Sequence, residues 1–114
     1  MAKKIIEYKE YEVRMAQNAI NDLNEIINFI AQNSPQTAIQ IMERIQSKIN
    51  KLNYFPYRGG YVPELLVRNI KDYRQMIEEP WKIIYKVDNN IVNILTIIDS
   101  RRNLQDILIK KLLK

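Results

Sequence analysis

Five cationic or phenolic side chains in the second half of the chain have the chemistry to act on a phosphate group. These residues are Arg74, Lys82, Tyr85, Arg101 and Arg102. A guanidinium group binds phosphate through paired hydrogen bonds, and it stabilises the negative charge that develops during RNA cleavage. The same group also binds the carboxylates of proteins. This set of residues therefore indicates an anionic partner, which is either a nucleic acid or an acidic protein.

Metal-free RNA cleavage also requires a base and an acid that exchange protons with the substrate. The chain has no histidine, and arginine stays protonated at neutral pH, so neither residue type supplies that base. No tyrosine follows Arg101-Arg102. Lys82, Lys86 and Tyr85 are left as substitutes, although Tyr85 alternates with apolar neighbours as a core residue of a strand would. These residues leave two possibilities open, cutting RNA and binding a partner.

Arginines and nearby aromatic residues are the side chains that we expect to contact a partner. They are Arg58, Tyr73, Arg74, Trp81, Arg101 and Arg102. Tryptophan is common in sheet packing and in protein interfaces, so Trp81 suits either place. The arginines also have a structural alternative, since ion pairs on the sheet surface would occupy them. The carboxylates within reach are Glu78, Glu79 and Asp99 for Arg74, and Asp99 and Asp106 for Arg101-Arg102.

Length and composition predict one domain over residues 1–114, because a second core would be too small to stand alone. Hydrophobic residues make up 46% of the chain, which is enough for a packed interior. The absence of cysteine and histidine excludes disulfides, thiolate metal sites and enzymes with a catalytic histidine, so no metal or other cofactor is implied. No apolar run has the length of a membrane span, so we expect a cytoplasmic protein without a membrane partner.

Positive charge is concentrated in the second half of the chain. The formal net charge is +5 at pH 7. Residues 1–57 hold seven Lys and Arg against six Asp and Glu, a difference of +1. Residues 58–114 hold eleven against seven, a difference of +4. A field of this sign attracts nucleic acid or an acidic protein partner.

The first half of the chain predicts a strand followed by a helical hairpin. Apolar and charged residues alternate over residues 11–15, as in a strand with one buried face. From Ala19 the apolar period becomes helical, and Ser34-Pro35 both ends this helix and starts the next. The second apolar stripe runs from Ala38 to Leu52. Two amphipathic helices joined this tightly must lie antiparallel.

The second half predicts three strands and a terminal helix. Gly59-Gly60 predict a turn with positive φ, and we interpret residues 61–71 as a loop grading into a short strand. Strands are expected near residues 73–78, 82–87 and 91–98, with a tight turn at Asn89-Asn90 and apolar residues on both faces of the last strand. A short helix follows over about residues 104–113. The order is β-α-α-β-β-β-α, an α+β fold whose core covers about residues 8–100.

Eight short segments stand in a recognisable order along the chain. They are Tyr11-Glu12-Val13-Arg14, Ala19-Ile20-Asn21-Asp22-Leu23, Ser34-Pro35, Phe55-Pro56-Tyr57-Arg58-Gly59, Pro63-Glu64-Leu65, Tyr73-Arg74, Ile83-Ile84-Tyr85-Lys86-Val87 and Ile97-Ile98-Asp99-Ser100-Arg101-Arg102-Asn103. In this order and spacing they resemble the RelE/ParE superfamily, the toxins of bacterial type II toxin–antitoxin modules. The resemblance covers about residues 11–108, which is nearly the whole chain.

The resemblance implies a helical hairpin packed on a small antiparallel sheet, in a protein that inhibits growth. It also implies a cognate antitoxin, usually acidic or amphipathic at its C-terminus, that wraps the toxin in a hetero-oligomer. RelE-like members cut mRNA on the ribosome, whereas ParE-like members poison DNA gyrase without acting as nucleases. Two positions depart from the family pattern. Ala16 stands where a helix-capping Ser or Thr is common, and Glu79-Pro80-Trp81-Lys82 replaces a more usual Gly-Asn-Tyr-Arg.

We therefore expect a ParE-like toxin that is neutralised by an acidic antitoxin and acts by binding DNA gyrase. The missing acid–base set and the long spacing between Gly59-Gly60 and Tyr73-Arg74 favour this branch. The alternative is a RelE-like, ribosome-dependent mRNA endonuclease that uses the five residues named at the outset. A further alternative is a basic binding module without toxic activity.

Overall fold

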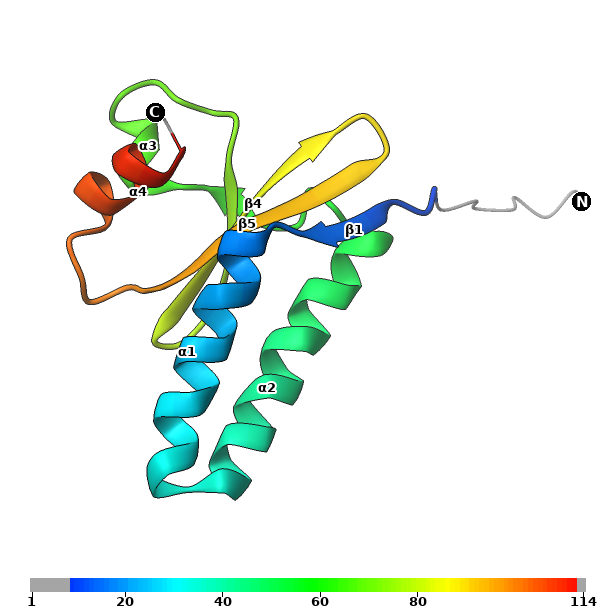
Figure 1. The fold of residues 1–114 in the computed structure, drawn as a ribbon. Helices are drawn as coiled ribbons and strands as arrows, with labels where there is room; N and C mark the ends of the chain where they lie inside the picture. The colour runs from blue at the N-terminus through cyan, green and yellow to red at the C-terminus, as the bar shows by residue number, and fades with distance from the viewer. Residues whose placement is uncertain (1–8, 113–114) are drawn as a thin grey trace, which may run out of the picture.

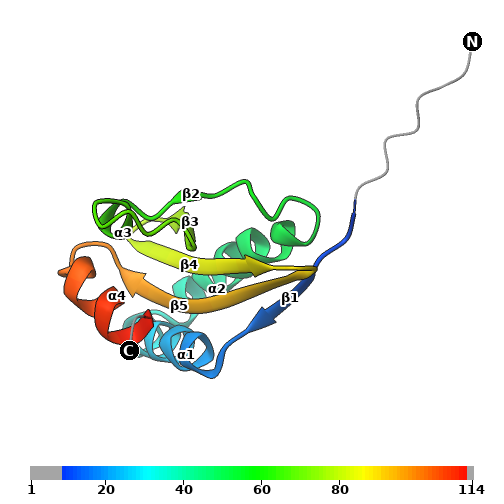
Figure 2. The same cartoon turned by 90° about the horizontal axis from the view of Figure 1, so that it is seen from above.

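The computed structural model describes residues 9–112, which form a five-stranded sheet with helices on both faces (Figures 1 and 2). The strand order in the sheet is β1-β5-β4-β3-β2. The strands are β1 (Glu12–Met15), β2 (Gly60–Tyr61), β3 (Arg74–Glu78), β4 (Trp81–Asp88) and β5 (Ile91–Asp99). The helices are α1 (Gln17–Asn33), α2 (Pro35–Asn50), α3 (Pro63–Leu66) and α4 (Leu104–Leu112).

Helices α1 and α2 form the predicted antiparallel hairpin, which projects from one face of the sheet (Figure 1). Ser34 stands between them, and its Oγ accepts a hydrogen bond from the Thr37 N–H at 3.2 Å. Pro35 occupies the first turn of α2, where its missing N–H has no cost. The predicted cap of α2 is therefore confirmed. At the start of α1, Ala16 supplies no side-chain cap.

The described apolar side chains pack into two clusters, one on each face of the sheet. The larger cluster lies between the sheet and the hairpin, and its buried members include Leu23, Ile45, Ile83, Tyr85 and Ile94. The smaller cluster lies against α3 and α4, and its buried members include Val62, Leu65, Ile84, Ile98 and Leu108. Burial on both faces explains why β4 and β5, in the middle of the sheet, carry apolar residues on both faces.

Strand β5 is covered on both faces, as predicted, and a bulge decides which residue faces which cluster. The register between β4 and β5 shifts at Ile84/Tyr85, which leaves Leu95 of β5 as the extra residue. Strict alternation would place Ile97 on the same face as Leu95. The bulge instead turns Ile97 toward the hairpin, while Leu95 packs with the smaller cluster.

The predicted α+β fold with a hairpin on a small sheet is confirmed, with one correction to the sheet. Strand β1 pairs parallel with β5, so the sheet is mixed rather than wholly antiparallel. The Glu12 N–H donates a hydrogen bond to the Asn90 carbonyl in the β4–β5 turn at 2.9 Å, so both strands start at the same end of the sheet. Parallel neighbours require a long crossover connection, which residues 16–90 provide.

The connection between α2 and β3 holds elements that the sequence did not predict. A 3-10 turn, Lys51–Asn53, continues α2, and the segment interpreted as a loop grading into a strand contains the end of β2 and helix α3. Helix α3 has only four residues, so it shows no periodic pattern in the sequence. Two predicted boundaries, Tyr8 for the core and Leu113 for the terminal helix, lie outside the described residues.

The predicted turn residues adopt different backbone conformations. Asn89 has φ 52°, which a tight hairpin turn requires. Neither Gly59 nor Gly60 has a positive φ, so the conformational reason that we predicted for the pair is wrong. The reason at Gly59 is space, because a Cβ there would overlap the Gln75 carbonyl oxygen and lie 2.6 Å from the Tyr85 hydroxyl oxygen. A Cβ on Gly60 would meet nothing within 4 Å.

Gly59→Ala is therefore expected to lower the free energy of unfolding by about 1–3 kcal/mol, the usual cost of forcing atoms into a packed site. Gly60→Ala is the matched control, and it should change the free energy of unfolding by less than about 0.5 kcal/mol or stabilise slightly. Urea denaturation of both variants measures the difference. Equal effects of the two substitutions would contradict the assignment.

Candidate functional site

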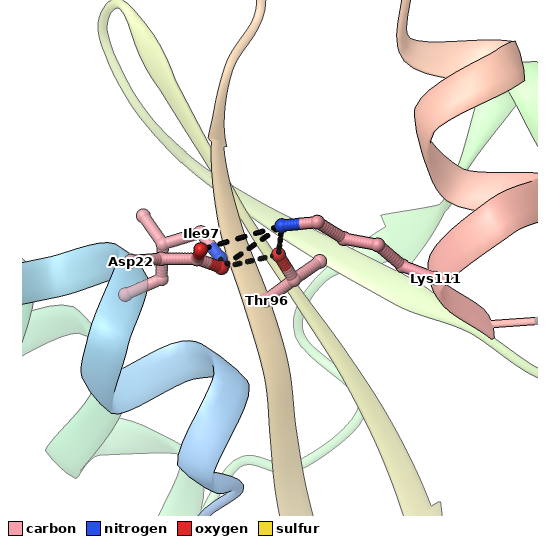
Figure 3. Close-up of polar contacts among 4 residues, drawn as sticks. All are labelled: Asp22, Thr96, Ile97 and Lys111. Carbon is pink, nitrogen blue, oxygen red and sulfur yellow. Dashed lines mark hydrogen bonds and ion pairs between the residues drawn. The ribbon is translucent and has the colours of Figure 1, made fainter. Parts of the chain in front are cut away.

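Strand β5 extends beyond its neighbour β1, and the carboxylate of Asp22 occupies the edge that this leaves open (Figure 3). Pairing between the two strands stops at Met15 and Ile94. Asp22 Oδ2, on α1, then accepts hydrogen bonds from the Ile97 N–H at 3.1 Å and the Thr96 hydroxyl at 2.5 Å. The carboxylate thus accepts the hydrogen bond that a neighbouring strand would otherwise accept. Its contribution is substantial, since a buried N–H without an acceptor costs about 1–3 kcal/mol.

Lys111 joins helix α4 to the same point. Its Nζ lies 3.3 Å from Asp22 Oδ1 and 3.2 Å from Thr96 Oγ1, so α1, β5 and α4 meet at one carboxylate (Figure 3). The side chain of Asp22 is only 14% exposed, and that of Lys111 is 29% exposed. Partial burial strengthens this ion pair compared with one in water. The contact fixes the terminal helix against the sheet.

A groove of about 580 Å³ lies beside this contact, between α1 and the end of β5. We call it the Trp81 groove. Its lining residues are Asp22, Glu25, Ile26, Phe29, Ile30, Pro80, Trp81, Ile97, Ile98, Asp99, Arg101, Arg102 and Lys111. Phe29 is 70% exposed, so the rim carries an apolar side chain next to charged ones. Three of the predicted partner-binding residues, Trp81, Arg101 and Arg102, therefore line one concave surface.

Arg101 in this groove is held by Asp99, as the structural alternative proposed. Its Nη2 lies 2.5 Å from Asp99 Oδ2, and its Nε and backbone N–H donate to Asp99 Oδ1, each at 2.9 Å. These hydrogen bonds lower the pKa of the Asp99 carboxyl to about 2, and the charge of Arg102 contributes. Arg102 forms no ion pair among the described residues and stays available to a partner.

A second group of predicted residues lies elsewhere, around Arg74. The Arg74 guanidinium is stacked with two tyrosines, 5.1 Å from the ring centre of Tyr57 and 4.7 Å from that of Tyr61. Its Nη1 donates a hydrogen bond to the Gly59 carbonyl at 2.7 Å. The structural alternative, an ion pair of Arg74 with Glu78, Glu79 or Asp99, is therefore wrong. Arg58 lies next to this stack in the chain and is exposed.

The three candidates for proton transfer, Tyr85, Lys82 and Lys86, have structural partners; for Lys86 it is Asp88, whose Oδ2 lies 3.9 Å from Lys86 Nζ. Tyr85 is fully buried, and its hydroxyl oxygen accepts a hydrogen bond from the Gly59 N–H at 3.0 Å. Burial raises the pKa of the Tyr85 phenol, and the side chain is not exposed to solvent. Lys82 Nζ lies 2.7 Å from Glu64 Oε1 of α3. None of these side chains is poised toward a substrate.

The five predicted phosphate-binding residues do not converge on one point. Arg74, at the start of β3, pairs with Tyr85 in the middle of β4, whereas Trp81 at the start of β4 pairs with Asp99. About 13 Å of strand separates these two pairs at the usual rise per residue. Arg101-Arg102 follow Asp99, so they lie at the far end of the sheet from Arg74. The two sets also have different contacts, with Tyr57, Tyr61 and the Gly59 carbonyl around Arg74 and Asp99 beside Arg101.

Tyr73 differs from the other predicted partner-binding residues because its side chain is 8% exposed and packs in the smaller cluster. The sequence analysis in turn missed Asp22 and Lys111 as an anchor, and Tyr57 and Tyr61 as the stack around Arg74. The contacts of Asp22 lie 74 and 89 residues away in the chain, so no local pattern could reveal them.

Residues 9–112 contain neither a cluster of metal ligands nor a helix suited to span a membrane. No group of three or more carboxylates in this part of the chain is placed to hold a metal ion. None of the helices described there combines the length and the apolar character that a membrane span requires.

Comparison with known proteins identifies the family. The model of the family described as "ParE toxin of type II toxin-antitoxin system, parDE" matches residues 13–104, most of the chain. The chain belongs to this ParE toxin family. The matched range contains every predicted site residue and Asp22, while Lys111 lies outside it. No curated protein sequence matches the chain.

Two solved structures resemble the fold of this ParE-family chain. One is the chromosomal ParDE toxin–antitoxin system of P. aeruginosa, with 18% sequence identity, a TM-score of 0.65, and coverage of 80% of this chain and 97% of the other. The second is the toxin–antitoxin complex RelBE2 of Mycobacterium tuberculosis, with 18% identity, a TM-score of 0.54, and coverage of 79% and 91%. The predicted membership of the RelE/ParE superfamily is confirmed.

The Asp22 anchor of this ParE-family chain predicts a large effect of its removal. Asp22→Ala should lower the free energy of unfolding by about 3 kcal/mol, because Thr96, Ile97 and Lys111 all lose their acceptor. Glu25→Ala, on the same helix and exposed, is the control and should cost less than about 0.5 kcal/mol. Thermal and urea unfolding measure both. If Asp22→Ala lowers the free energy of unfolding as little as Glu25→Ala does, Asp22 does not anchor these elements.

The Asp99–Arg101 pair predicts a pH dependence with a definite sign. The folded-state pKa of Asp99, about 2, lies below its ordinary value of 3.8. The pair therefore stabilises the fold fully above about pH 4, and its contribution is lost as the pH falls through 2. An NMR titration of the Asp99 carboxyl should show a midpoint near 2, and Arg101→Ala should raise it toward 3.8. If Arg101→Ala leaves the midpoint of the Asp99 titration unchanged, Arg101 is not the cause of the low pKa.

Proposed function

We propose that this ParE-family chain is a growth-inhibiting toxin that acts in the cytoplasm by binding DNA gyrase, and that an acidic antitoxin neutralises it. One observation carries the choice of binding over RNA cleavage, which is that the candidate catalytic groups do not converge. Tyr85 is buried with a raised pKa, Lys82 is paired with Glu64, and Arg74 lies far from Arg101-Arg102. Membership of the ParE family supports the same branch.

The antitoxin partner is supported by charge and by the relatives. Residues 58–114 carry a difference of +4 between basic and acidic residues, and both similar structures are described as toxin–antitoxin systems or complexes. An acidic segment would neutralise this field and cover exposed arginines. Arg102 in the Trp81 groove and Arg58 beside the Arg74 stack are the exposed cations that such a partner would contact first.

Gyrase supercoiling in the presence of the purified protein tests the proposed target. The protein should inhibit supercoiling of relaxed plasmid and leave cleaved DNA after denaturation. Tyr85→Phe should retain this inhibition, because the Tyr85 hydroxyl bonds only within the fold; its cost should be stability, about 1 kcal/mol for one lost hydrogen bond. Unimpaired supercoiling at stoichiometric protein, with no cleaved DNA, would contradict the proposal.

The same preparation separates the two remaining functions. Primer extension on mRNA during translation should show no codon-linked cuts, and cuts that disappear in Arg74→Ala would instead identify a ribosome-dependent endonuclease. Induced expression of the soluble protein should arrest growth. Normal growth, together with unaffected gyrase and intact mRNA, would identify a basic binding module without toxic activity.

A further inference from the structure

We propose that the exposed rings of the loop before β2 bind single-stranded DNA, with the bases stacked on the rings and the phosphates held by neighbouring arginines. The surface consists of Tyr54, Phe55, Tyr57, Arg58, Tyr61 and Arg74, and we call it the aromatic surface. None of these residues lines the Trp81 groove. The assignment rests on the proposed function only in taking DNA rather than RNA as the strand.

The segment that carries the rings is basic and has no acidic residue. Residues 44–63 contain no Asp or Glu, and their cations are Arg44, Lys48, Lys51 and Arg58. Arg58 is exposed, and neither it nor Arg74 forms an ion pair among the described residues. A positive field of this kind attracts the phosphates of a nucleic acid.

Every large apolar side chain that is exposed in this segment is aromatic. Within residues 44–63 these side chains are Tyr54, Phe55, Tyr57 and Tyr61, and their exposed fractions are 44%, 49%, 57% and 42%. Elsewhere the exposed apolar side chains are mostly aliphatic, such as Ile39 and Val67. Unpaired bases stack on the flat faces of rings, whatever the sequence of the strand. The composition of the surface therefore favours a nucleic acid.

Arg74 orients two of the rings. Its guanidinium lies 5.1 Å from the ring centre of Tyr57 and 4.7 Å from that of Tyr61. Tyr61 is the register partner of Arg74 across β2 and β3, so the two side chains share one face of the sheet. Cation–π contacts of this kind hold the rings in place. Both rings remain exposed, which leaves area on which a base can stack.

The two arginines have donors left for phosphate. Within the described residues Arg74 donates hydrogen bonds only through Nη1, to the carbonyls of Gly59 at 2.7 Å and Tyr57 at 3.4 Å. Its Nε and Nη2 are left to form the paired hydrogen bonds that guanidinium makes with phosphate. Burial raises the pKa of Tyr85, and the charges of Arg74 and Arg58 both oppose that rise, so both lie near the Tyr85 hydroxyl. A strand stacked on the rings would pass both guanidinium groups.

The loop that carries the rings is fixed at both ends. At its start the Tyr11 N–H donates a hydrogen bond to the Asn53 carbonyl at 2.6 Å, so the loop passes close to the start of β1 (Figure 2). At its end the Gly59 N–H donates to the buried Tyr85 hydroxyl at 3.0 Å. Tyr11 also meets the ring of Tyr57 edge-on, with centroids 6.4 Å apart. The rings are thus positioned before a strand binds, which reduces the entropy lost on binding.

An unpaired strand suits the aromatic surface better than a duplex does. In a duplex the bases stack on one another and present only their edges in the grooves. In a single strand each base has a face that is free to stack on a ring. Stacking does not distinguish deoxyribose from ribose, so DNA is named because the proposed target, gyrase, acts on DNA.

Two strands of equal charge test the stacking. The purified full-length protein is titrated into fluorescent oligothymidine of about twelve nucleotides, a length within the usual range of site sizes, and into an abasic strand of the same length. The abasic strand has the phosphates but no bases. Fluorescence anisotropy should therefore show that oligothymidine binds about tenfold more tightly than the abasic strand.

Substitutions at Tyr57 show whether the rings are responsible. Tyr57→Leu should weaken the binding of oligothymidine about tenfold and leave the affinity for the abasic strand unchanged. Tyr57→Phe keeps the ring and should bind like the wild type. Tyr61→Leu repeats the test at the second ring. Because both tyrosines are exposed, all three variants should unfold close to the temperature of the wild type.

A substitution at Arg58 tests the phosphate contact. Arg58→Gln should reduce the slope of log affinity against log salt by about 0.7, the value for one phosphate contact to a single strand. The reduction should be the same for oligothymidine and the abasic strand. Lys110→Gln is the control, because it removes the same charge from an exposed position on α4, and it should leave the slope unchanged.

Four outcomes would overturn the assignment. They are equal affinity for oligothymidine and the abasic strand, equal affinity of Tyr57→Leu and Tyr57→Phe for oligothymidine, tighter binding of oligouridine or of a duplex than of oligothymidine, and tighter binding of an acidic peptide of alternating Glu and Val.

Gyrase supercoiling measured with the same preparations keeps the two proposals apart. If the protein binds oligothymidine through Tyr57 but leaves gyrase unaffected, the aromatic surface is supported and the gyrase proposal fails. If the protein inhibits gyrase but does not bind oligothymidine, the aromatic surface is wrong and the gyrase proposal stands.

Discussion

The carboxylate of Asp22 is the constraint on which the rest of the structure depends. Strand β5 contributes residues to both apolar clusters, but β1 pairs only with its first half. The edge of β5 beyond this pairing would otherwise leave a buried backbone N–H without an acceptor. Asp22 supplies that acceptor from α1, and Lys111 then brings α4 to the same point. The terminal helix and the Trp81 groove both adjoin this contact, and the larger apolar cluster packs the hairpin on the same sheet.

The sheet that is built in this way holds its cationic side chains in two separate places. The arginines after β5 belong to the groove beside the Asp22 anchor, and Arg74 belongs to the tyrosine stack next to the middle of β4. Catalysis of phosphate transfer needs donors and a proton-transferring group within hydrogen-bond distance of one substrate. This separation supports the proposal that the protein acts by binding, since arginines and exposed aromatic rings are common in protein interfaces.

The local features of the fold could be predicted from the sequence, because each depends on neighbours in the chain. The helical stripes, the Ser34 cap and the Asn89 turn are of this kind. Features that depend on distant residues could not be predicted. The parallel pairing of β1, the reason for Gly59 and the anchor at Asp22 each involve a partner at least 15 residues away, such as Gln75 for Gly59 or Ile97 for Asp22. The bulge at Leu95 likewise changed the face that simple alternation assigns to Ile97.

Amide hydrogen exchange at Ile97 tests the central claim most directly. The Ile97 N–H donates its hydrogen bond to the Asp22 carboxylate, where a neighbouring strand would otherwise accept it. In the native protein the Ile97 amide should be protected as strongly as that of Val92, which lies where β1 covers β5. In Asp22→Ala, the account predicts that Ile97 exchanges faster by about 100-fold while Val92 changes much less. Equal protection of Ile97 with and without the carboxylate would contradict the account.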